Sequence, residues 1–276
     1  MQERIVILGA GESGVGAAVL AKVKGFAVFV SDNGLIPSKY KLSLKAHEIP
    51  FEEGGHDASQ ILSAKEIVKS PGIPDTAPII IKAKEKNIAV ISEIEFALRY
   101  TSARLIGITG TNGKTTTTLL TYHLLKENGL NVGLAGNIGH SLAMQVAQAD
   151  KDYYVIELSS FQLDGMYQAR LNVGILLNVT PDHLNRYDND IEKYLLSKFR
   201  ISQNMRDQDV FIYNQSDARV NTVAKLPTTP ARKISISMEN RKMLMPIHNS
   251  KTWSFWKEGK QASSLPKFCL CKASTT

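Results

Sequence analysis

The chain has 276 residues, of which 43% are hydrophobic and 21% charged, a composition that fits roughly two folded domains and excludes wholesale disorder. No run approaches about 18 consecutive apolar residues, and no signal-peptide pattern precedes the first apolar stretch, so we expect a cytoplasmic protein without membrane insertion. Two cysteines exclude a disulfide framework.

The net positive charge comes from the end of the chain. Residues 1–224 hold 23 Lys and Arg against 24 Asp and Glu, whereas residues 225–276 hold 10 against 2. Both tryptophans and both cysteines also lie in that last segment. A basic segment can bind nucleic acid, but this one contains no recognisable binding module. We expect no nucleic-acid partner and predict that residues 238–276 form a divergent basic tail that does not complete a native domain.

The N-terminal residues predict a β-α-β unit. Residues 4–9 form a short β-branched run typical of a buried parallel strand, and residues 26–32 form a second. A helix is expected between them at residues 17–24. Further elements of the first domain are predicted at residues 61–69, 77–86, 88–92 and 93–100.

Three glycines, Gly9, Gly11 and Gly14, separate the first strand from the helix. Glycine lets the backbone approach a phosphate closely, and the N–H groups of a helix N-terminus attract anions. Asp32 ends the second strand 21 residues after Gly11, where a carboxylate can bond a ribose hydroxyl. Taken alone, this loop predicts NAD binding or a purely structural tight turn.

A second nucleotide-binding signal lies between a strand and a helix, at Gly110-Thr-Asn-Gly-Lys-Thr-Thr116. Backbone N–H groups around Gly113 would wrap phosphate oxygens, Lys114 would neutralise their charge and Thr115 would bind Mg²⁺. The strict P-loop pattern is not met, because Ile108 stands where its first glycine belongs. The Gly-Lys-Thr segment between a strand and a helix still favours nucleotide binding.

Further elements of the second domain are predicted at residues 105–109, 153–158, 173–179, 190–203 and 210–214. Glu157 ends one of these strands, where a carboxylate could hold Mg²⁺ beside the P-loop or simply form a cap or salt bridge. The predicted fold class is α/β, with an N-terminal Rossmann-like domain at residues 1–93. A P-loop ATPase-like central domain with a mainly parallel sheet follows at residues 94–237.

Four motifs resemble a known family in their order and spacing: Gly110–Thr116, Gly136-Asn-Ile-Gly139, Glu157-Leu-Ser-Ser-Phe-Gln-Leu163 and Asn178-Val-Thr-Pro-Asp-His-Leu184. Together they look like the Mur ligases, ATP-dependent amide-forming enzymes of peptidoglycan precursor synthesis. The Ser-Ser-Phe-Gln-Leu segment, the N-terminal glycine loop and Ser70-Pro-Gly-Ile-Pro74 are similar to the MurD type, which adds D-glutamate to UDP-N-acetylmuramoyl-L-alanine. The resemblance covers about residues 4–224.

The resemblance implies a role for each motif residue. It also implies that the N-terminal domain binds the UDP part of the substrate rather than NAD. The implied substrate-binding residues are Glu12, Ser13, Gly14, Asp32, Asn33, Ser70, Asn137, Ser159, Gln162 and His183. The implied ATP-binding residues are Gly110, Thr111, Asn112, Gly113, Lys114, Thr115 and Thr116. The implied Mg²⁺ ligands are Thr115, Glu157, His183 and Lys198 as its carbamate, and the implied catalytic residues are Lys114, His183 and Lys198.

In the implied reaction the substrate carboxylate attacks the γ-phosphate of ATP, and the D-glutamate amine displaces phosphate from the resulting acyl phosphate. Lys114 and Mg²⁺ would offset the repulsion between the two anions.

Asn185 and Tyr187 stand where the family often has Asp and His. The resemblance fades after about Ser237, so we expect the family's closing third domain to be missing. Without that domain, we expect ligation to be undetectable and ATP binding to survive. We also expect the chain to be a monomer.

Other functions compete with this one. The chain could be a non-catalytic nucleotide-binding fragment, an NAD-dependent oxidoreductase, a nucleic-acid binder through its tail, or another Mur or folylpolyglutamate-type ligase. The P-loop with Glu157 and His183 argues against the oxidoreductase, and the Ser-Ser-Phe-Gln-Leu segment favours the MurD type.

Overall fold

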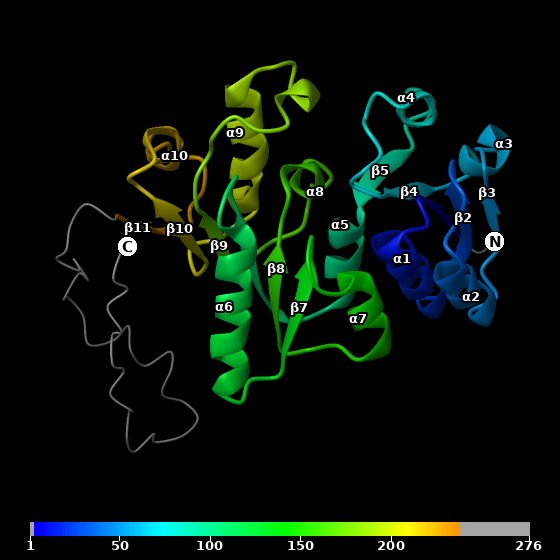
Figure 1. The fold of residues 1–276 in the computed structure, drawn as a ribbon, viewed down its shortest axis with the longest axis horizontal. Helices are drawn as coiled ribbons and strands as arrows, with labels where there is room; N and C mark the ends of the chain where they lie inside the picture. The colour runs from blue at the N-terminus through cyan, green and yellow to red at the C-terminus, as the bar shows by residue number, and fades with distance from the viewer. Residues whose placement is uncertain (1–2, 238–276) are drawn as a thin grey trace, which may run out of the picture. The chain divides into compact units, whose positions relative to one another are not determined.

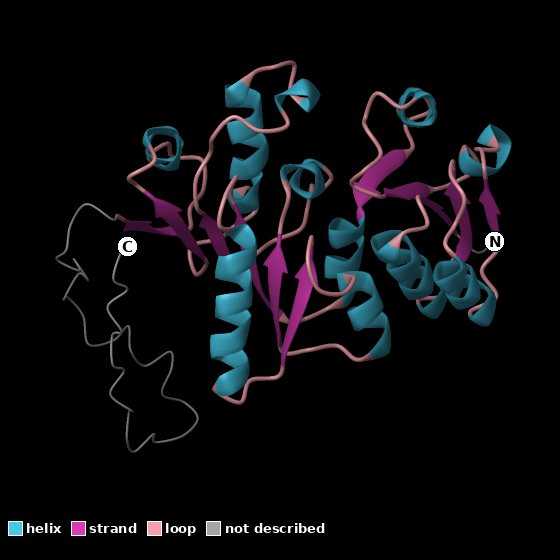
Figure 2. Ribbon diagram, in the orientation of Figure 1, coloured by secondary structure: helices cyan, strands magenta, loops and turns pink. Residues whose placement is uncertain are grey.

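The computed structural model describes residues 3–237, which contain two β-sheets (Figure 1). Every strand pair in both sheets is parallel, and strands alternate with helices along the chain (Figure 2). The α/β fold class is therefore confirmed. No helix among these residues is long and apolar enough to cross a membrane. The predicted divergent tail, residues 238–276, lies outside the described residues.

The N-terminal sheet has the strand order β3-β2-β1-β4-β5. Its strands are β1 (Arg4–Leu8), β2 (Ala27–Asp32), β3 (Phe51–Glu53), β4 (Glu66–Lys69) and β5 (Ala89–Ser92). Its helices are α1 (Glu12–Val23), α2 (Ser38–Ala46), α3 (Ala58–Ile61) and α4 (Pro78–Glu85). The strand order reverses between β1 and β4, so the loops after these two strands meet at the carboxyl edge, where α/β sheets bind ligands.

The second sheet has the order β11-β10-β9-β6-β8-β7. Its strands are β6 (Arg104–Thr109), β7 (Val132–Gly136), β8 (Tyr153–Glu157), β9 (Val173–Leu176), β10 (Val210–Asn214) and β11 (Arg232–Ile236). Its helices are α6 (Lys114–Glu127), α7 (Leu142–Gln148), α8 (Ser160–Asp164), α9 (Ile191–Phe199) and α10 (Ala218–Ala224), with 3₁₀ turns η2 (Leu184–Arg186) and η3 (Arg200–Ser202). Because β8 and β9 flank β6, the loops after these three strands lie side by side.

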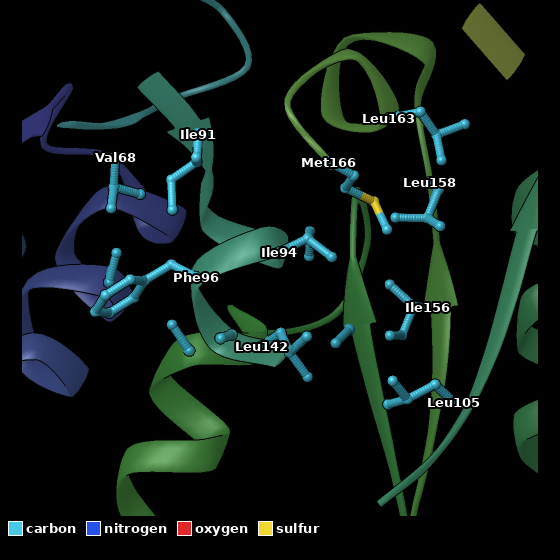
Figure 3. Close-up of a cluster of buried hydrophobic side chains, with 14 of the residues drawn as sticks. Val68, Ile91, Ile94, Phe96, Leu105, Leu142, Ile156, Leu158, Leu163 and Met166 are labelled. Atoms are coloured by element: carbon cyan, nitrogen blue, oxygen red, sulfur yellow. The ribbon is translucent and has the colours of Figure 1, made fainter. Parts of the chain in front are cut away.

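The sheets are joined through α5 (Glu93–Ala97) and the 3₁₀ turn η1 (Leu98–Tyr100). Figure 3 shows buried side chains of α5, including Ile94, within the core that also contains Val68 of β4 and Ile156 of β8. Helix α1 contacts α7 at Gly16, where an added Cβ would lie 1.9 Å from the Ser141 hydroxyl. Glycine at this position therefore allows the two helices to approach closely.

The observed elements differ from the predicted ones mainly at their ends. Helix α1 begins at Glu12 rather than at residue 17. Strand β9 ends at Leu176 rather than at residue 179, because residues 177–180 turn away to bind the P-loop. Elements that were not predicted are α2, β3, α3, β7, α7, α8, α10 and β11.

Candidate active site

The predicted ATP-binding residues form the turn between β6 and α6. Gly113 adopts a left-handed φ of 80° at the N-cap of α6, a conformation that favours glycine. The Thr111 N–H donates to the Asn178 carbonyl over 2.9 Å, and the Asn112 N–H donates to the Asn178 side-chain oxygen over 2.8 Å. The loop after β9 therefore fixes this turn, and the first N–H groups of α6 can receive a phosphate.

Lys114 is the first residue of α6, and its side chain folds back over the turn. Its Nζ donates to the Thr111 carbonyl over 2.8 Å. Thr115 and Thr116 follow it in the first helical turn and are exposed. An ammonium and two hydroxyls thus lie at the helix end that attracts phosphate.

Glu157 ends β8 and is only 1% exposed. Its Oε1 accepts a hydrogen bond of 2.8 Å from Asn137 Nδ2, whereas its Oε2 has no hydrogen-bond partner among the described residues. A buried carboxylate oxygen without a partner is costly, and Mg²⁺ prefers oxygen ligands. Glu157 therefore fits the magnesium ion that the resemblance implies. No group of three His, Cys, Asp or Glu side chains forms a ready metal site within residues 3–237.

Lys198 lies in the last turn of α9 and is 1% exposed. Its Nζ donates to the Gly110 carbonyl over 2.9 Å and lies 4.5 Å from the centre of the Tyr194 ring. Burial, assisted by the nearby charge of Lys114, lowers the pKa of Lys198 to about 7. A large fraction of this amine is therefore neutral near neutral pH, and the neutral amine is the form that reacts with CO₂.

A cavity of about 270 Å³, here called the central cavity, collects these groups at the end of the second sheet. Predicted site residues that line it are Lys114, Asn137, Ser159, His183 and Lys198. Pro71, Gly72, Ser160, Phe161, Asp182 and Tyr194 complete the lining. Glu157 adjoins it through Asn137.

His183 is held at the rim of the central cavity in a left-handed backbone conformation with a φ of 50°. Its side chain is 59% exposed, and its Nε2 lies 3.5 Å from an Asp182 carboxylate oxygen. Its ring centre is 5.5 Å from that of Phe161. The guanidinium of Arg186 lies 4.0 Å from the centre of the Phe161 ring and donates to the Pro71 carbonyl over 3.3 Å. Arg186 therefore links the His183 loop to the loop after β4.

A larger cavity of about 810 Å³, here called the N-terminal cavity, lies at the carboxyl edge of the first sheet. Of the predicted substrate-binding residues, Ser13, Asp32, Asn33 and Ser70 line it. Other lining residues are Gly9, Gly11, His56, Ala58, Pro71, Gly72, Ile73, Pro74, Ala77, Pro78, Ile79 and Lys82. Pro71 and Gly72 line both cavities, so the loop after β4 borders the two sites.

Asp32 holds the glycine loop in place as well as lining the N-terminal cavity. Its two carboxylate oxygens accept hydrogen bonds from the Ala10 N–H over 2.7 Å and the Gly34 N–H over 2.8 Å. An ionised carboxylate has further lone pairs for a ligand hydroxyl. Asp32 can therefore position the backbone and bind a ligand with the same side chain.

Three of the predicted substrate-binding residues line neither cavity. Glu12 is exposed and accepts a hydrogen bond of 3.2 Å from the Tyr40 hydroxyl. Gln162 is buried and completes a capping box with Ser159 at the start of α8. Gly14 is buried, and an added Cβ would lie 1.8 Å from the Gly9 carbonyl oxygen, so this glycine brings α1 close to β1 rather than clearing space for a ligand.

Sequence reasoning missed several residues that line or support the cavities: His56, Lys82, Phe161, Arg186 and Tyr194. A single histidine outside any motif, such as His56, gives no sequence signal of a binding role. Phe161 and Tyr194 are aromatic residues of short helices, where aromatic side chains usually indicate a core. The position of Phe161 and Tyr194 between polar motif residues is the sequence feature that could have indicated a place in the site.

Comparison with known proteins places most of the described region in one family. The family model of the Mur ligase middle domain matches residues 108–266, and that of the MurD-like N-terminal domain matches residues 3–92. The chain is 62% identical over 215 residues to a UDP-N-acetylmuramoylalanine–D-glutamate ligase of Bacteroides fragilis, covering 78% of the chain and 48% of that protein. It is 59% identical over 238 residues to the ligase of that name in Porphyromonas gingivalis, covering 86% and 53%.

The chain thus spans about half the length of the curated relatives it matches. Its fold is similar to that of a solved UDP-N-acetylmuramate:L-alanyl-γ-D-glutamyl-meso-diaminopimelate ligase of Neisseria meningitides, with a TM-score of 0.59, 22% identity and coverage of 84% of this chain and 78% of that one. A solved UDP-N-acetylmuramate–alanine ligase of Thermotoga maritima gives a TM-score of 0.53 at 19% identity, covering 87% and 53%.

Proposed function

The chain belongs to the Mur ligase family, and we propose that it acts in the ATP-dependent addition of D-glutamate to UDP-N-acetylmuramoyl-L-alanine in the cytoplasm. The observation that carries this proposal is the central cavity, which Lys114 of the P-loop, His183 and Lys198 all line. The names of the two relatives at 62% and 59% identity support D-glutamate as the added amino acid.

The two cavities suit one long substrate. The glycine loop and the N-terminus of α1 line the N-terminal cavity and would bind the diphosphate. From there the sugar and its alanyl group would pass Pro71 and Gly72, which border both cavities, so that the substrate carboxylate reaches Lys114. This placement explains why polar motif residues occur at the carboxyl edges of both sheets.

The chemistry requires two anions, the substrate carboxylate and the γ-phosphate of ATP, to approach each other. Lys114 would neutralise part of that charge, and the fixed N–H groups of the P-loop would orient the phosphates. Thr115 and Glu157 would hold one Mg²⁺, while His183 and the carbamate of Lys198 would hold a second. When bound, these ions supply further charge neutralisation.

Phosphate release tests the proposal when the chain is joined to the part of the Bacteroides fragilis ligase that it does not span, since we expect the chain alone to bind ATP without ligation. ATP, Mg²⁺, UDP-N-acetylmuramoyl-L-alanine and D-glutamate are supplied together, and each is then omitted in turn. A ligase should release phosphate only when all are present, and Lys114→Ala should abolish the release. Lys126→Ala is the matched control, because this lysine lies in the last turn of the same helix.

The same assay separates the competing functions. Calorimetric binding of ATP and the UDP-sugar without phosphate release would assign these residues to a binding module rather than an enzyme. Binding of NAD more tightly than the UDP-sugar would contradict the substrate assignment. Phosphate release with a folate substrate instead would point to the folylpolyglutamate-type ligases.

A further inference from the structure

We infer that His56 recognises the nucleobase in the N-terminal cavity, by accepting a hydrogen bond from the N3–H of uracil. The inference rests on the proposed function, which places a uridine diphosphate group in this cavity. His56 lines the cavity and follows β3. Its ring contacts Ser31, which in turn binds Glu52, and neither Ser31 nor Glu52 lines the cavity.

The hydrogen bonds around Ser31 determine which ring nitrogen of His56 carries the proton. Ser31 is completely buried, and its Oγ lies 2.6 Å from Glu52 Oε1 and 2.6 Å from His56 Nδ1. An ionised carboxylate only accepts hydrogen bonds, so the single hydroxyl proton goes to Glu52. The remaining contact is satisfied when His56 Nδ1–H donates to Ser31 Oγ.

This arrangement makes Nε2 of the neutral imidazole a hydrogen-bond acceptor. Glu52 is itself fixed, because its Oε1 also accepts the Asp57 N–H over 2.9 Å. Two neighbouring groups thus specify the tautomer, and His56 presents an acceptor of fixed chemistry to the cavity. A ligand group that meets Nε2 must therefore be a donor.

The layout of the cavity places the base near His56. The diphosphate belongs at the glycine loop, and the sugar must leave past Pro71 and Gly72 toward the central cavity. The nucleoside then extends the other way, toward Asp32 at the end of β2 and His56 beyond β3, since β3 is the outer neighbour of β2. Ribose hydroxyls meet a carboxylate at the end of the second strand in such folds, and the base lies beyond them.

Uracil and cytosine differ at the atom that Nε2 would contact. Uracil carries a proton on N3, whereas cytosine has a lone pair there, and two acceptors facing each other repel. A site built to accept a hydrogen bond rejects an analogue that lacks the donor. His56 should therefore make the cavity select uridine over cytidine nucleotides.

Calorimetric titration of the full chain with UDP, CDP and N3-methyl-UDP tests this selection. We expect UDP to bind at least about 10-fold more tightly than the other two, the effect of one hydrogen bond and one unpaired acceptor. His56→Ala should weaken UDP binding about 10-fold and leave CDP binding within about 2-fold. His56→Gln retains an acceptor oxygen on a side chain of similar reach and should restore part of the preference.

His47→Ala is the matched control, because its ring binds the Ser43 carbonyl at the end of α2, away from the cavity. Thermal unfolding of each variant checks that the fold is retained. If a variant does not fold, the relative affinities of the unaltered chain for UDP, CDP and N3-methyl-UDP still test the inference. Equal binding of UDP, CDP and N3-methyl-UDP, or equal losses for UDP and CDP in His56→Ala, would overturn the inference while leaving the uridine site intact. Failure of the chain to bind any of the three would overturn the proposed function together with it.

Discussion

At the scale of single residues, Lys198 has the environment that most constrains its chemistry. A lysine near the end of a short helix is usually solvated, but Lys198 is 1% exposed and its Nζ binds the Gly110 carbonyl of the P-loop. Its pKa of about 7, lowered by burial, lies well below the ordinary 10.5. The neutral fraction of the amine therefore increases as the pH rises through 7. The ammonium form has no lone pair and cannot bind a metal ion, so only the neutral form can lead to a metal ligand.

Carbamylation of Lys198 should follow this titration. In ¹³C NMR spectra with labelled bicarbonate, the carbamate signal should be weak at pH 6 and increase by pH 8, because the neutral amine reacts. Lys198→Arg should remove the signal. Lys193→Arg should not, since Lys193 is exposed on the same helix and paired with Asp188. A signal that persists in Lys198→Arg, or no signal at pH 8, would rule out the carbamate.

Gly11 and Gly14 belong to one loop but should respond differently to a methyl group. A Cβ on Gly14 meets the Gly9 carbonyl at 1.8 Å, whereas a Cβ on Gly11 has no atom within 4 Å and its φ is −81°. Gly14→Ala should lower the free energy of unfolding by roughly 2–3 kcal/mol, because backbone must move. Gly11→Ala should change it by less than about 0.5 kcal/mol. Urea unfolding that ranks them the other way would refute this assignment.

At the scale of elements, α5 connects the two sheets through its acidic residues. Glu93 accepts hydrogen bonds from the Ser141 hydroxyl and the Ala143 N–H at the start of α7, both over 2.7 Å. Glu95 accepts from the N–H groups of three consecutive residues after α8. These carboxylates hold loops of the second sheet against the helix that leaves the first, so α5 sets how the two halves of the site meet.

Burial raises the pKa of Glu93 to about 7 from an ordinary 4.5, so its protonated form is favoured in the folded chain. The stabilising contribution of this group is present below about pH 4.5 and is lost as the pH rises through 7. Glu93→Gln keeps a hydrogen-bond acceptor and cannot ionise. The free energy of unfolding of this variant, relative to that of the parent chain, should therefore increase by roughly 2–3 kcal/mol from pH 5 to pH 8. Urea unfolding at several pH values measures this, with exposed Glu85→Gln as a control that should show no trend. A flat difference for Glu93→Gln would contradict the burial argument.

Elements with strong local patterns were predicted from the sequence, and those shaped by tertiary contacts were not. Apolar, β-branched runs gave β1, β2, β6, β8 and β10 within one residue or so at each end. Strand β7 was missed, because Val-Gly-Leu-Ala-Gly has two glycines and little β-propensity. The early start of α1 could not be predicted either, since Gly14 and Gly16 weaken a helix locally and are required only by contacts with Gly9 and Ser141.

At the scale of the whole molecule, the site depends on contacts between residues far apart in the sequence. Lys198 binds a residue 88 positions earlier, and Arg186 binds the Pro71 carbonyl 115 positions earlier. The motifs indicated which residue types take part, and the central cavity brings five of the predicted residues together. Periodicity carries no information on such pairs. Only the structure could therefore reveal the roles of Arg186 and His56 and the loop that both cavities share.

The central claim is that one substrate occupies both cavities, and calorimetric titration with UDP-N-acetylmuramoyl-L-alanine and with UDP tests it most directly. In the presence of ATP and Mg²⁺, the whole substrate should bind at least about 10-fold more tightly than UDP, because its far end makes additional contacts in the central cavity. Asn137→Ala removes a side chain that lines the central cavity but not the N-terminal cavity, together with its hydrogen bond to Glu157. It should remove most of that difference and leave UDP binding unchanged. Equal affinities for UDP and the whole substrate in the parent chain would contradict the account.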